Sequence, residues 1–230
     1  TGYLPHADLP SGAGSADPRV LPGRDFVSDV DLSGDGNGWD DDPTDAGDFV
    51  TAIEAATTRF KELNCVAQRS TWHGQVISGI LGASTNNNLG VAGINWGVRL
   101  LPVRVAGKCG ADLDDIVAGM YWAAGLTIPS GLSGQSVPSN QNPAKIINIS
   151  FGGSGSCGNL YTTAIAALKA SGVVVVAAAG NEHGAVSRPG NCADGLTVAA
   201  LNREGFKSSY SNFGPEVFIS TVGGDPGPFS

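Results

Sequence analysis

The chain has 230 residues, of which 41% are apolar, with a formal net charge of −8 and a pI of about 4.7. This length and apolar content suffice for one domain with a substantial core. The acidic charge argues against nucleic acid and anionic membranes as partners, and no apolar run approaches the roughly 20 residues that a membrane-spanning helix needs.

Residues 29–43 form a dense acidic run that is also rich in glycine. Glycine permits tight turns that bring several carboxylates onto one ion, and hard oxygen ligands suit Ca²⁺. The spacing differs from that of an EF-hand loop, so a solvated acidic loop is the alternative. We favour calcium because carboxylates this crowded repel one another unless a cation neutralises them. The expected ligands are Asp31, Asp35, Asn37 and Asp40.

Two helices are predicted next along the chain. Residues 47–64 place apolar residues at helical spacing, although threonines among them disfavour a helix. The second helix begins at His73, and Gly74 and Gly79 keep it thin enough to lie deep against other elements. A histidine in such a first turn has an ordinary pKa near neutrality, so it can take and return protons. An isolated His-Gly pair is more often a plain helix start than a catalytic base.

The middle of the chain is predicted to contain a turn, a strand, a helix and a loop. Residues 85–93 are rich in asparagine and glycine, and residues 100–105 have the composition of a strand. Asp112 is predicted to cap a helix whose apolar face includes Ile116 and Met120. We interpret the nearby aspartates as capping and dipole partners instead of acid–base machinery. Residues 127–143 are typical of a surface loop.

The last part of the chain alternates strands and a helix. Strands are predicted at residues 145–150, 173–179 and 196–200, with a helix at 160–170. The β-branched run at 173–179 is typical of a strand buried on both faces, and it leads into Asn181, a neutral donor where open parallel sheets place their sites. The pattern predicts a single α/β domain with a doubly wound, mostly parallel sheet and helices on both faces.

Three segments resemble the subtilisin-like serine proteases, the subtilases. His73-Gly74 is similar to the start of the family's histidine motif, and Ala-Ala-Gly-Asn at residues 178–181 matches the motif of its oxyanion asparagine. Residues 148–153, Asn-Ile-Ser-Phe-Gly-Gly, resemble its substrate-binding strand. The segments occur in the family's order, and the resemblance runs from about residue 1 to about residue 225, with secreted bacterial members that have two disulfides as the nearest relatives. Gln75 and Val76 depart from the usual Thr-His.

The resemblance implies a subtilisin-like fold and a secreted, extracellular endopeptidase that hydrolyses peptide bonds in proteins through a Ser-His-Asp triad. His73 would be the base, and Asn181 would donate to the oxyanion. The segment that would pair with the backbone of a protein or peptide substrate by strand addition comprises Ser150, Phe151 and Gly152. The residues that would line the pocket for a large apolar P1 side chain are Ala178, Ala179 and Gly180.

The same resemblance implies a calcium loop and two disulfides. In the loop at 85–93, Asn87 would bind Ca²⁺ through its side chain; a plain asparagine-rich turn is the alternative. The expected carbonyl ligands are Thr85, Leu89 and Val91. No Cys-x-x-Cys motif occurs, which argues against zinc. The relatives imply the pairs Cys65–Cys109 and Cys157–Cys192, each worth roughly 3–4 kcal/mol in the chain-entropy model and typical of an oxidising compartment, with four free thiols as the alternative.

Two members of the triad are not found in the sequence. In the family, Thr-Gly directly follows the catalytic aspartate, and here Thr1-Gly2 begins the chain, while Asp8 and Asp17 lie in predicted loops. The family's serine motif, Gly-Thr-Ser-Met-Ala, is also absent. We therefore expect residues 1–230 to be a subtilase catalytic domain without the segments that carry the aspartate, before residue 1, and the serine, after residue 230.

Residues 1–230 alone are accordingly predicted to be inactive. A complementary segment of the same enzyme, a propeptide and an inhibitor are candidate partners in addition to substrate. Two other functions stay open: a non-catalytic subtilase relative that binds peptide or protein in the same cleft, and a calcium-binding structural module.

Overall fold

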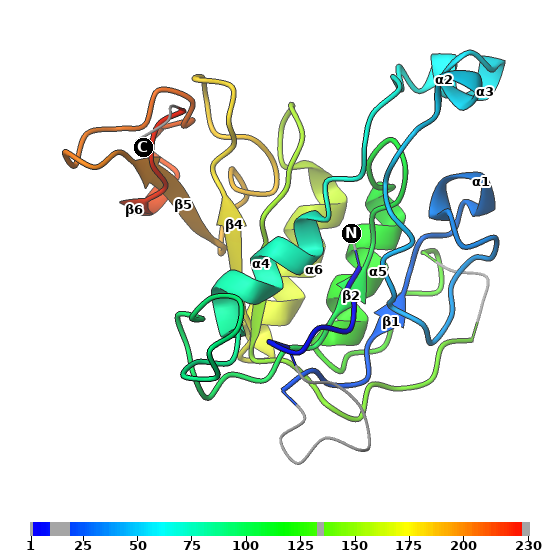
Figure 1. Cartoon of the computed structure of the whole chain (residues 1–230), viewed down its shortest axis with the longest axis horizontal. Helices are drawn as coiled ribbons and strands as arrows, with labels where there is room; N and C mark the ends of the chain where they lie inside the picture. The colour runs from blue at the N-terminus through cyan, green and yellow to red at the C-terminus, as the bar shows by residue number, and fades with distance from the viewer. Residues whose placement is uncertain (1, 10–18, 133–135, 227–230) are drawn as a thin grey trace. The chain divides into compact units, whose positions relative to one another are not determined.

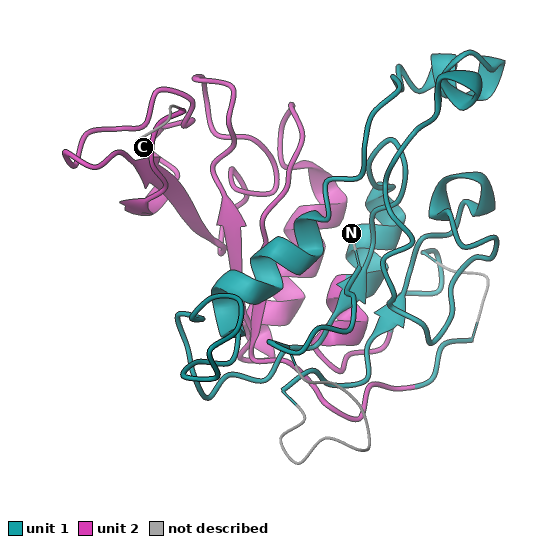
Figure 2. Cartoon of the chain, in the orientation of Figure 1, with its two compact units in different colours: residues 1–119, 128–138 teal, residues 120–127, 139–230 magenta. Residues whose placement is uncertain are grey.

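A computed structural model of the chain describes residues 2–9, 19–132 and 136–226. Thr1, Asp17 and residues 133–135 of the predicted surface loop lie outside the described residues. The chain divides into two compact units, one within residues 1–119 and 128–138 and the other within residues 120–127 and 139–230 (Figure 1, Figure 2). The assignment of residues 1–230 to one domain stays a prediction.

The first unit holds a short parallel sheet and the helical residues that precede residue 120. Its elements are α1 (Val30–Ser33), α2 (Ala52–Ala55), α3 (Thr58–Glu62), α4 (His73–Gly82), the first part of α5 (Leu113–Ala123), and the paired strands β1 (Arg24–Asp25) and β2 (Val103–Arg104). The helix predicted from His73 is confirmed. The cap of α5 is confirmed too, because the side chain of Asp112 accepts a hydrogen bond from the N–H of Asp114 at 2.8 Å.

Residues 47–64 form two short helices in place of the one predicted helix. The hydroxyl of Thr51 accepts from the N–H of Glu54, and the Glu54 carboxylate accepts from the N–H of Thr51, which is a capping box at the start of α2. The hydroxyl of Thr57 accepts from the N–H of Phe60 and starts α3. The threonines that weaken a single helix therefore begin two separate ones, because their hydroxyls satisfy the free N–H groups of a first turn.

The second unit contains a four-stranded, entirely parallel sheet (Figure 1). Its strands are, in spatial order, β3 (Ile146–Ile149), β4 (Val174–Ala178), β5 (Leu196–Leu201) and β6 (Val217–Val222), with α6 (Gly158–Ala170) between β3 and β4 in the chain. The three strands and the helix predicted for this part of the chain are confirmed. β6 was not predicted. Its sequence, Val-Phe-Ile-Ser-Thr-Val, does not alternate apolar and polar residues, and five of its six residues are exposed, so it lacks the pattern of a half-buried strand.

Both predicted disulfides are confirmed. Cys65 is bonded to Cys109 in the first unit, and Cys157 is bonded to Cys192 in the second, with Cα–Cα distances of 5.3 and 5.0 Å. Such bonds are typical of proteins that fold in an oxidising compartment. Among the described residues, no helix is long and apolar enough to cross a membrane.

Candidate functional site

His73 is the first residue of α4 and is half-buried. The residue before it, Trp72, has a left-handed conformation (φ 51°), so the chain turns sharply into the helix without a side-chain cap. Burial lowers the pKa of His73 because the charged imidazolium loses water. The imidazole is therefore neutral at neutral pH, which is the state that can accept a proton.

Asp48 supports the entry to this helix and was missed by the sequence analysis. Its Oδ1 accepts a hydrogen bond from the N–H of Thr71 at 2.6 Å, and its Oδ2 accepts one from the Thr71 hydroxyl at 2.8 Å. Its negative charge raises the pKa of His73 and so opposes the effect of burial. The contact spans 23 positions in the chain, and no local pattern distinguishes Asp48 from its acidic neighbours.

Asn181 lies just beyond the end of β4 and is exposed. In the neighbouring strand β3, Ile149 pairs with Ala177, so the predicted substrate-binding residues 150–152 and the residues 178–181 continue from the same edge of the sheet. Carboxyl ends of adjacent parallel strands are where such sheets bind ligands. A Cβ on Gly152 would lie 2.4 Å from the carbonyl oxygen of Arg188, so only glycine permits that close approach.

The predicted P1 wall, which is residues 178–180, is only partly accessible to solvent. Ala179 is buried in a cluster with Val186 and Ala199, whereas Ala178 and Gly180 are half-buried. His73 and Asn181 lie in different units, so the structure brings together the predicted substrate-binding residues and the asparagine but leaves the histidine in its own unit. The roles assigned to these residues stay predictions.

The asparagine-rich loop encloses the carboxylate of Asp8, a residue that the sequence analysis placed in a plain loop. Oδ1 of Asp8 accepts a hydrogen bond from Asn87 Nδ2 at 2.6 Å, and Oδ2 accepts one from the N–H of Val91 at 2.8 Å. These bonds lower the pKa of Asp8, the Asn87 amide being the first cause, so the carboxylate is ionised at neutral pH. The contact spans 79 positions, which explains why no local pattern revealed it.

Two observations test whether this loop suits a calcium ion. A Cβ on Gly90, whose φ is +53°, would lie 2.0 Å from Oδ2 of Asp8, so the loop wraps the carboxylate as closely as a glycine allows. The hydroxyl of Thr85 is buried and has no hydrogen-bond partner. A carboxylate, an amide, a hydroxyl and backbone carbonyls are the hard oxygen donors that Ca²⁺ prefers. The residues present therefore fit the ion.

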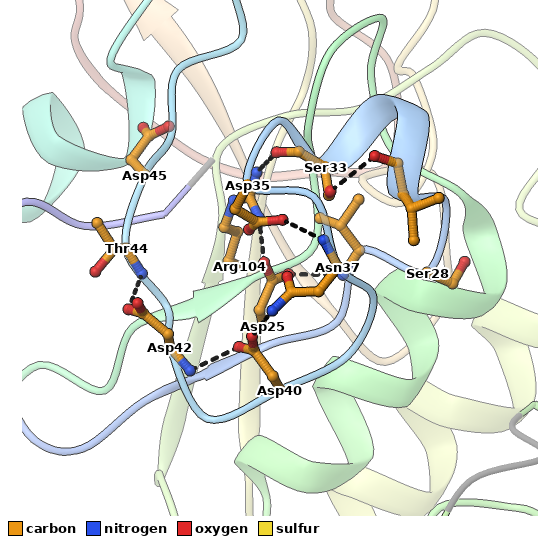
Figure 3. Close-up of polar contacts among 12 residues, drawn as sticks. Asp25, Ser28, Ser33, Asp35, Asn37, Asp40, Asp42, Thr44, Asp45 and Arg104 are labelled. Atoms are coloured by element: carbon orange, nitrogen blue, oxygen red, sulfur yellow. Dashed lines mark hydrogen bonds and ion pairs between the residues drawn. The ribbon is translucent and has the colours of Figure 1, made fainter.

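The acidic segment, residues 29–43, lies beside Arg104 (Figure 3). Arg104 forms ion pairs with Asp25, which is completely buried, and with Asp35 at 2.6 Å. The Asn37 amide donates to Oδ2 of Asp40 at 2.5 Å, while Asp31 lies on α1. Arg24 pairs with Asp41, and Arg59 pairs with Asp29, so three guanidiniums together offset part of the crowded negative charge.

The structure links three of the four predicted ligands of the acidic segment, because Asn37 donates hydrogen bonds to Asp35 and to Asp40, while Asp31 lies on α1. Where the structure describes the chain, no group of three or more His, Cys, Asp or Glu side chains could hold a metal ion. This does not bear on the asparagine-rich loop, whose expected donors include only one carboxylate. Calcium at the acidic segment stays a prediction.

Comparison with known proteins gives concordant results. The family model described as the Subtilase family (Peptidase_S8) matches residues 27–228. The chain is 42% identical over 225 residues to an extracellular protease of Xanthomonas campestris pv. campestris, covering 97% of this chain and 36% of the relative. It is 38% identical over 225 residues to an extracellular basic protease of Dichelobacter nodosus, covering 97% of this chain and 35% of that relative.

A solved structure described as proteases from Pseudoalteromonas arctica is similar to this chain with a TM-score of 0.86 and 41% identity. The match covers 99% of this chain and 62% of that chain. This chain spans about a third of the length of the Xanthomonas and Dichelobacter relatives. The similarity of backbone and sequence together supports the α/β fold with parallel sheets.

Proposed function

The chain belongs to the subtilase family, and from that premise we propose that the complete polypeptide is a secreted serine endopeptidase. The observation that carries the proposal is the edge of the second unit's sheet, where Asn181 follows β4 beside residues 150–152, which follow β3. This edge places a neutral amide donor next to a segment that continues from a strand, and these two features suit an oxyanion donor and a partner for the substrate backbone. The relatives named extracellular proteases and the two disulfides support secretion.

In the proposed mechanism His73 acts as general base and then as general acid. Its neutral imidazole takes the proton of the attacking serine hydroxyl and later gives that proton to the leaving amine. A water molecule then attacks the acyl-enzyme, and His73 takes and returns a proton in the same way. The serine and the orienting aspartate are not assigned among these 230 residues, and we expect them elsewhere on the longer polypeptide.

Asn181 is proposed to donate its side-chain amide to the tetrahedral oxyanion. The charge on that oxygen develops only as the carbonyl carbon is attacked, so the donor lowers the barrier more than it strengthens substrate binding. Ser150, Phe151 and Gly152 are proposed to pair with the substrate backbone as an added strand. Ala178 and Gly180 are the accessible members of the proposed P1 wall.

Labelling with a serine-directed phosphonate tests the proposed chemistry. We expect the complete polypeptide to hydrolyse a peptide ester, and the phosphonate to abolish this activity while attaching to one serine outside residues 1–230. Peptide mapping by mass spectrometry locates the label. Residues 1–230 made alone should show neither hydrolysis nor labelling. Peptide binding without hydrolysis or labelling by the complete polypeptide would instead favour a non-catalytic relative.

We also propose that the Asp8–Asn87 loop holds Ca²⁺, with oxygen ligands from Asp8, Thr85, Asn87, Leu89 and Val91. The bound ion would cross-link the start of the chain to the loop after α4. An ion that binds only the folded state adds about 2.7 kcal/mol when present at 100 times its dissociation constant. For a domain of this size, that free energy corresponds to a rise of roughly 5–10 °C in the thermal midpoint.

Asp8→Asn should remove most of this calcium-dependent rise, because the variant takes away the one carboxylate of the site. The measurement is the thermal midpoint of the complete polypeptide, inhibited by phosphonate, with excess calcium and with excess chelator. Asp40→Asn is the matched control, since it makes the same change in the acidic segment. A midpoint indifferent to chelator would count against both calcium sites, and a loss confined to Asp40→Asn would place the ion in the acidic segment.

A further inference from the structure

The side chain of Asn212 is completely buried within the loop that carries Asn181, with an exposed fraction of 0%. Its Oδ1 accepts hydrogen bonds from the main-chain N–H groups of Glu182 and Gly184, each at 2.9 Å. Its Nδ2 donates to the carbonyl oxygen of Ala179 at 3.1 Å. A single amide therefore bonds peptide groups on both sides of Asn181.

A second link runs from Asn212 to the N–H of Asn181 through Glu182. Oε2 of Glu182 accepts hydrogen bonds from Asn212 Nδ2 at 2.5 Å and from the N–H of Asn181 at 3.0 Å. The hydroxyl of Ser187 donates to the same oxygen at 3.1 Å. These bonds lower the pKa of Glu182, the Asn212 amide being the first cause, so the carboxylate is ionised at neutral pH and its hydrogen bonds are charge-assisted.

Gly180 permits this close packing. Its φ is +108°, and a Cβ at that position would lie 2.4 Å from Nδ2 of Asn212. The N–H of Asn212 also donates to the carbonyl oxygen of Gly180 at 3.0 Å. The peptide groups immediately before and after Asn181 are thus held by Asn212 directly, and the N–H of Asn181 itself is held through Glu182.

This arrangement matters because the side chain of Asn181 is exposed. Packing contributes little to the placement of an exposed side chain, so the main chain sets the position and the Cα–Cβ direction from which the amide extends. A donor stabilises an oxyanion only when it is already aimed at the position that the charge will occupy. We propose that Asn212 is a positioning residue for Asn181, and this inference rests on the proposed role of Asn181 as oxyanion donor.

Asn212→Ser in the complete polypeptide tests the inference, because serine is small enough to be buried but cannot span the same set of bonds. We expect kcat for a peptide ester to fall about 10- to 100-fold, with KM changed less than about threefold, since oxyanion stabilisation acts in the transition state. In subtilisin, removal of this oxyanion donor costs about 10²–10³ in kcat, and Asn181→Ala should behave similarly.

A double-mutant cycle distinguishes positioning from a general structural role. In the Asn181→Ala background, Asn212→Ser should lower kcat further by less than about threefold, because there is no amide left to position. Asn140→Ser is the matched control: Asn140 bonds main-chain atoms of Trp122, Ala123 and Asn142, and its replacement should leave kcat unchanged in both backgrounds.

Glu182→Ala provides a second variant in case Asn212→Ser fails to fold, since the Glu182 side chain is exposed. Loss of its bond to the N–H of Asn181 should lower kcat about 3- to 10-fold, an effect that disappears in the Asn181→Ala background. Equal losses in both backgrounds, or a rise in KM at constant kcat, would overturn the inference. An Asn181→Ala variant with unchanged kcat would instead refute the oxyanion role itself.

Discussion

His73→Ala in the complete polypeptide should lower kcat for a peptide ester by about 10⁶-fold, the magnitude that removal of the base costs in subtilisin itself. The loss is this large because the serine hydroxyl is a poor nucleophile until its proton is taken. KM should change only a few-fold, since the imidazole is proposed to act on the reacting groups and not on the bound peptide chain. Steady-state kinetics at neutral pH, where burial keeps His73 uncharged, provide the measurement.

His6→Ala is the control for this prediction. His6 is exposed, and its Nδ1 accepts one hydrogen bond from the N–H of Asp8 at 3.1 Å. At saturating calcium its replacement should leave kcat within about twofold of the unmodified protein, because exposed substitutions away from a site have small effects. A His73→Ala variant that retained more than a hundredth of the activity would show that another group is the base.

Arg104→Met should strongly destabilise the first unit, costing about 3–5 kcal/mol in the free energy of unfolding. The guanidinium is almost completely buried and pairs with Asp25, which is buried as well, and it also donates to the carbonyl oxygen of Ser33. Methionine fills a similar volume, so the cost comes chiefly from leaving a buried carboxylate without its cation. Denaturant unfolding of the phosphonate-inhibited protein measures it.

The cost should depend on pH. Burial raises the pKa of Asp25 to about 6 even beside Arg104, and removal of the cation should raise that pKa further. A carboxyl whose pKa is higher in the folded than in the unfolded state adds most to the free energy of unfolding at low pH. That stabilisation is lost as the pH rises through the folded-state pKa. Arg104→Met should therefore be less damaging at pH 5 than at pH 8.

Lys169→Met is the comparison, because it breaks an exposed ion pair. Lys169 pairs with Asp194 at 2.5 Å, and the two side chains are 63% and 41% exposed. An exposed pair of this kind contributes about 0–1 kcal/mol. Equal effects of the two substitutions, or an Arg104→Met cost that does not vary with pH, would contradict the account of a buried, charge-dependent pair.

Local sequence patterns were sufficient to predict the elements that carry the proposed chemistry. The apolar run that ends in Ala-Ala-Gly-Asn predicts β4 and the position of Asn181 just after it, because strand burial and strand ends follow from residues that are neighbours in the chain. The helix that starts at His73 follows from the same kind of pattern. The disulfide pairing could be predicted only through the resemblance to secreted subtilases.

The supporting residues could not be predicted, because their partners are distant in the chain. Asp8 meets Asn87 across 79 positions, and Asn212 bonds Glu182 across 30. An aspartate or asparagine in a loop has the same local signature whether it faces solvent or holds another loop. The acidic segment shows the same limit, since one of its counter-charges, Arg104, is supplied from β2, 69 positions after Asp35.

The two disulfides also determine what a cut in the backbone would do. The sequence between Cys65 and Cys109 contains His73 and Asn87, and the sequence between Cys157 and Cys192 contains Asn181. Residues 86–92 are exposed and belong to the kind of loop that proteases cleave first, whereas the exposed main chain at 181–183 is held by Asn212 and Glu182. A molecule nicked between residues 86 and 92 would still be one covalent body, with its two fragments parting only on reduction. The crosslink thus lets a cut in this loop break the backbone without releasing a fragment.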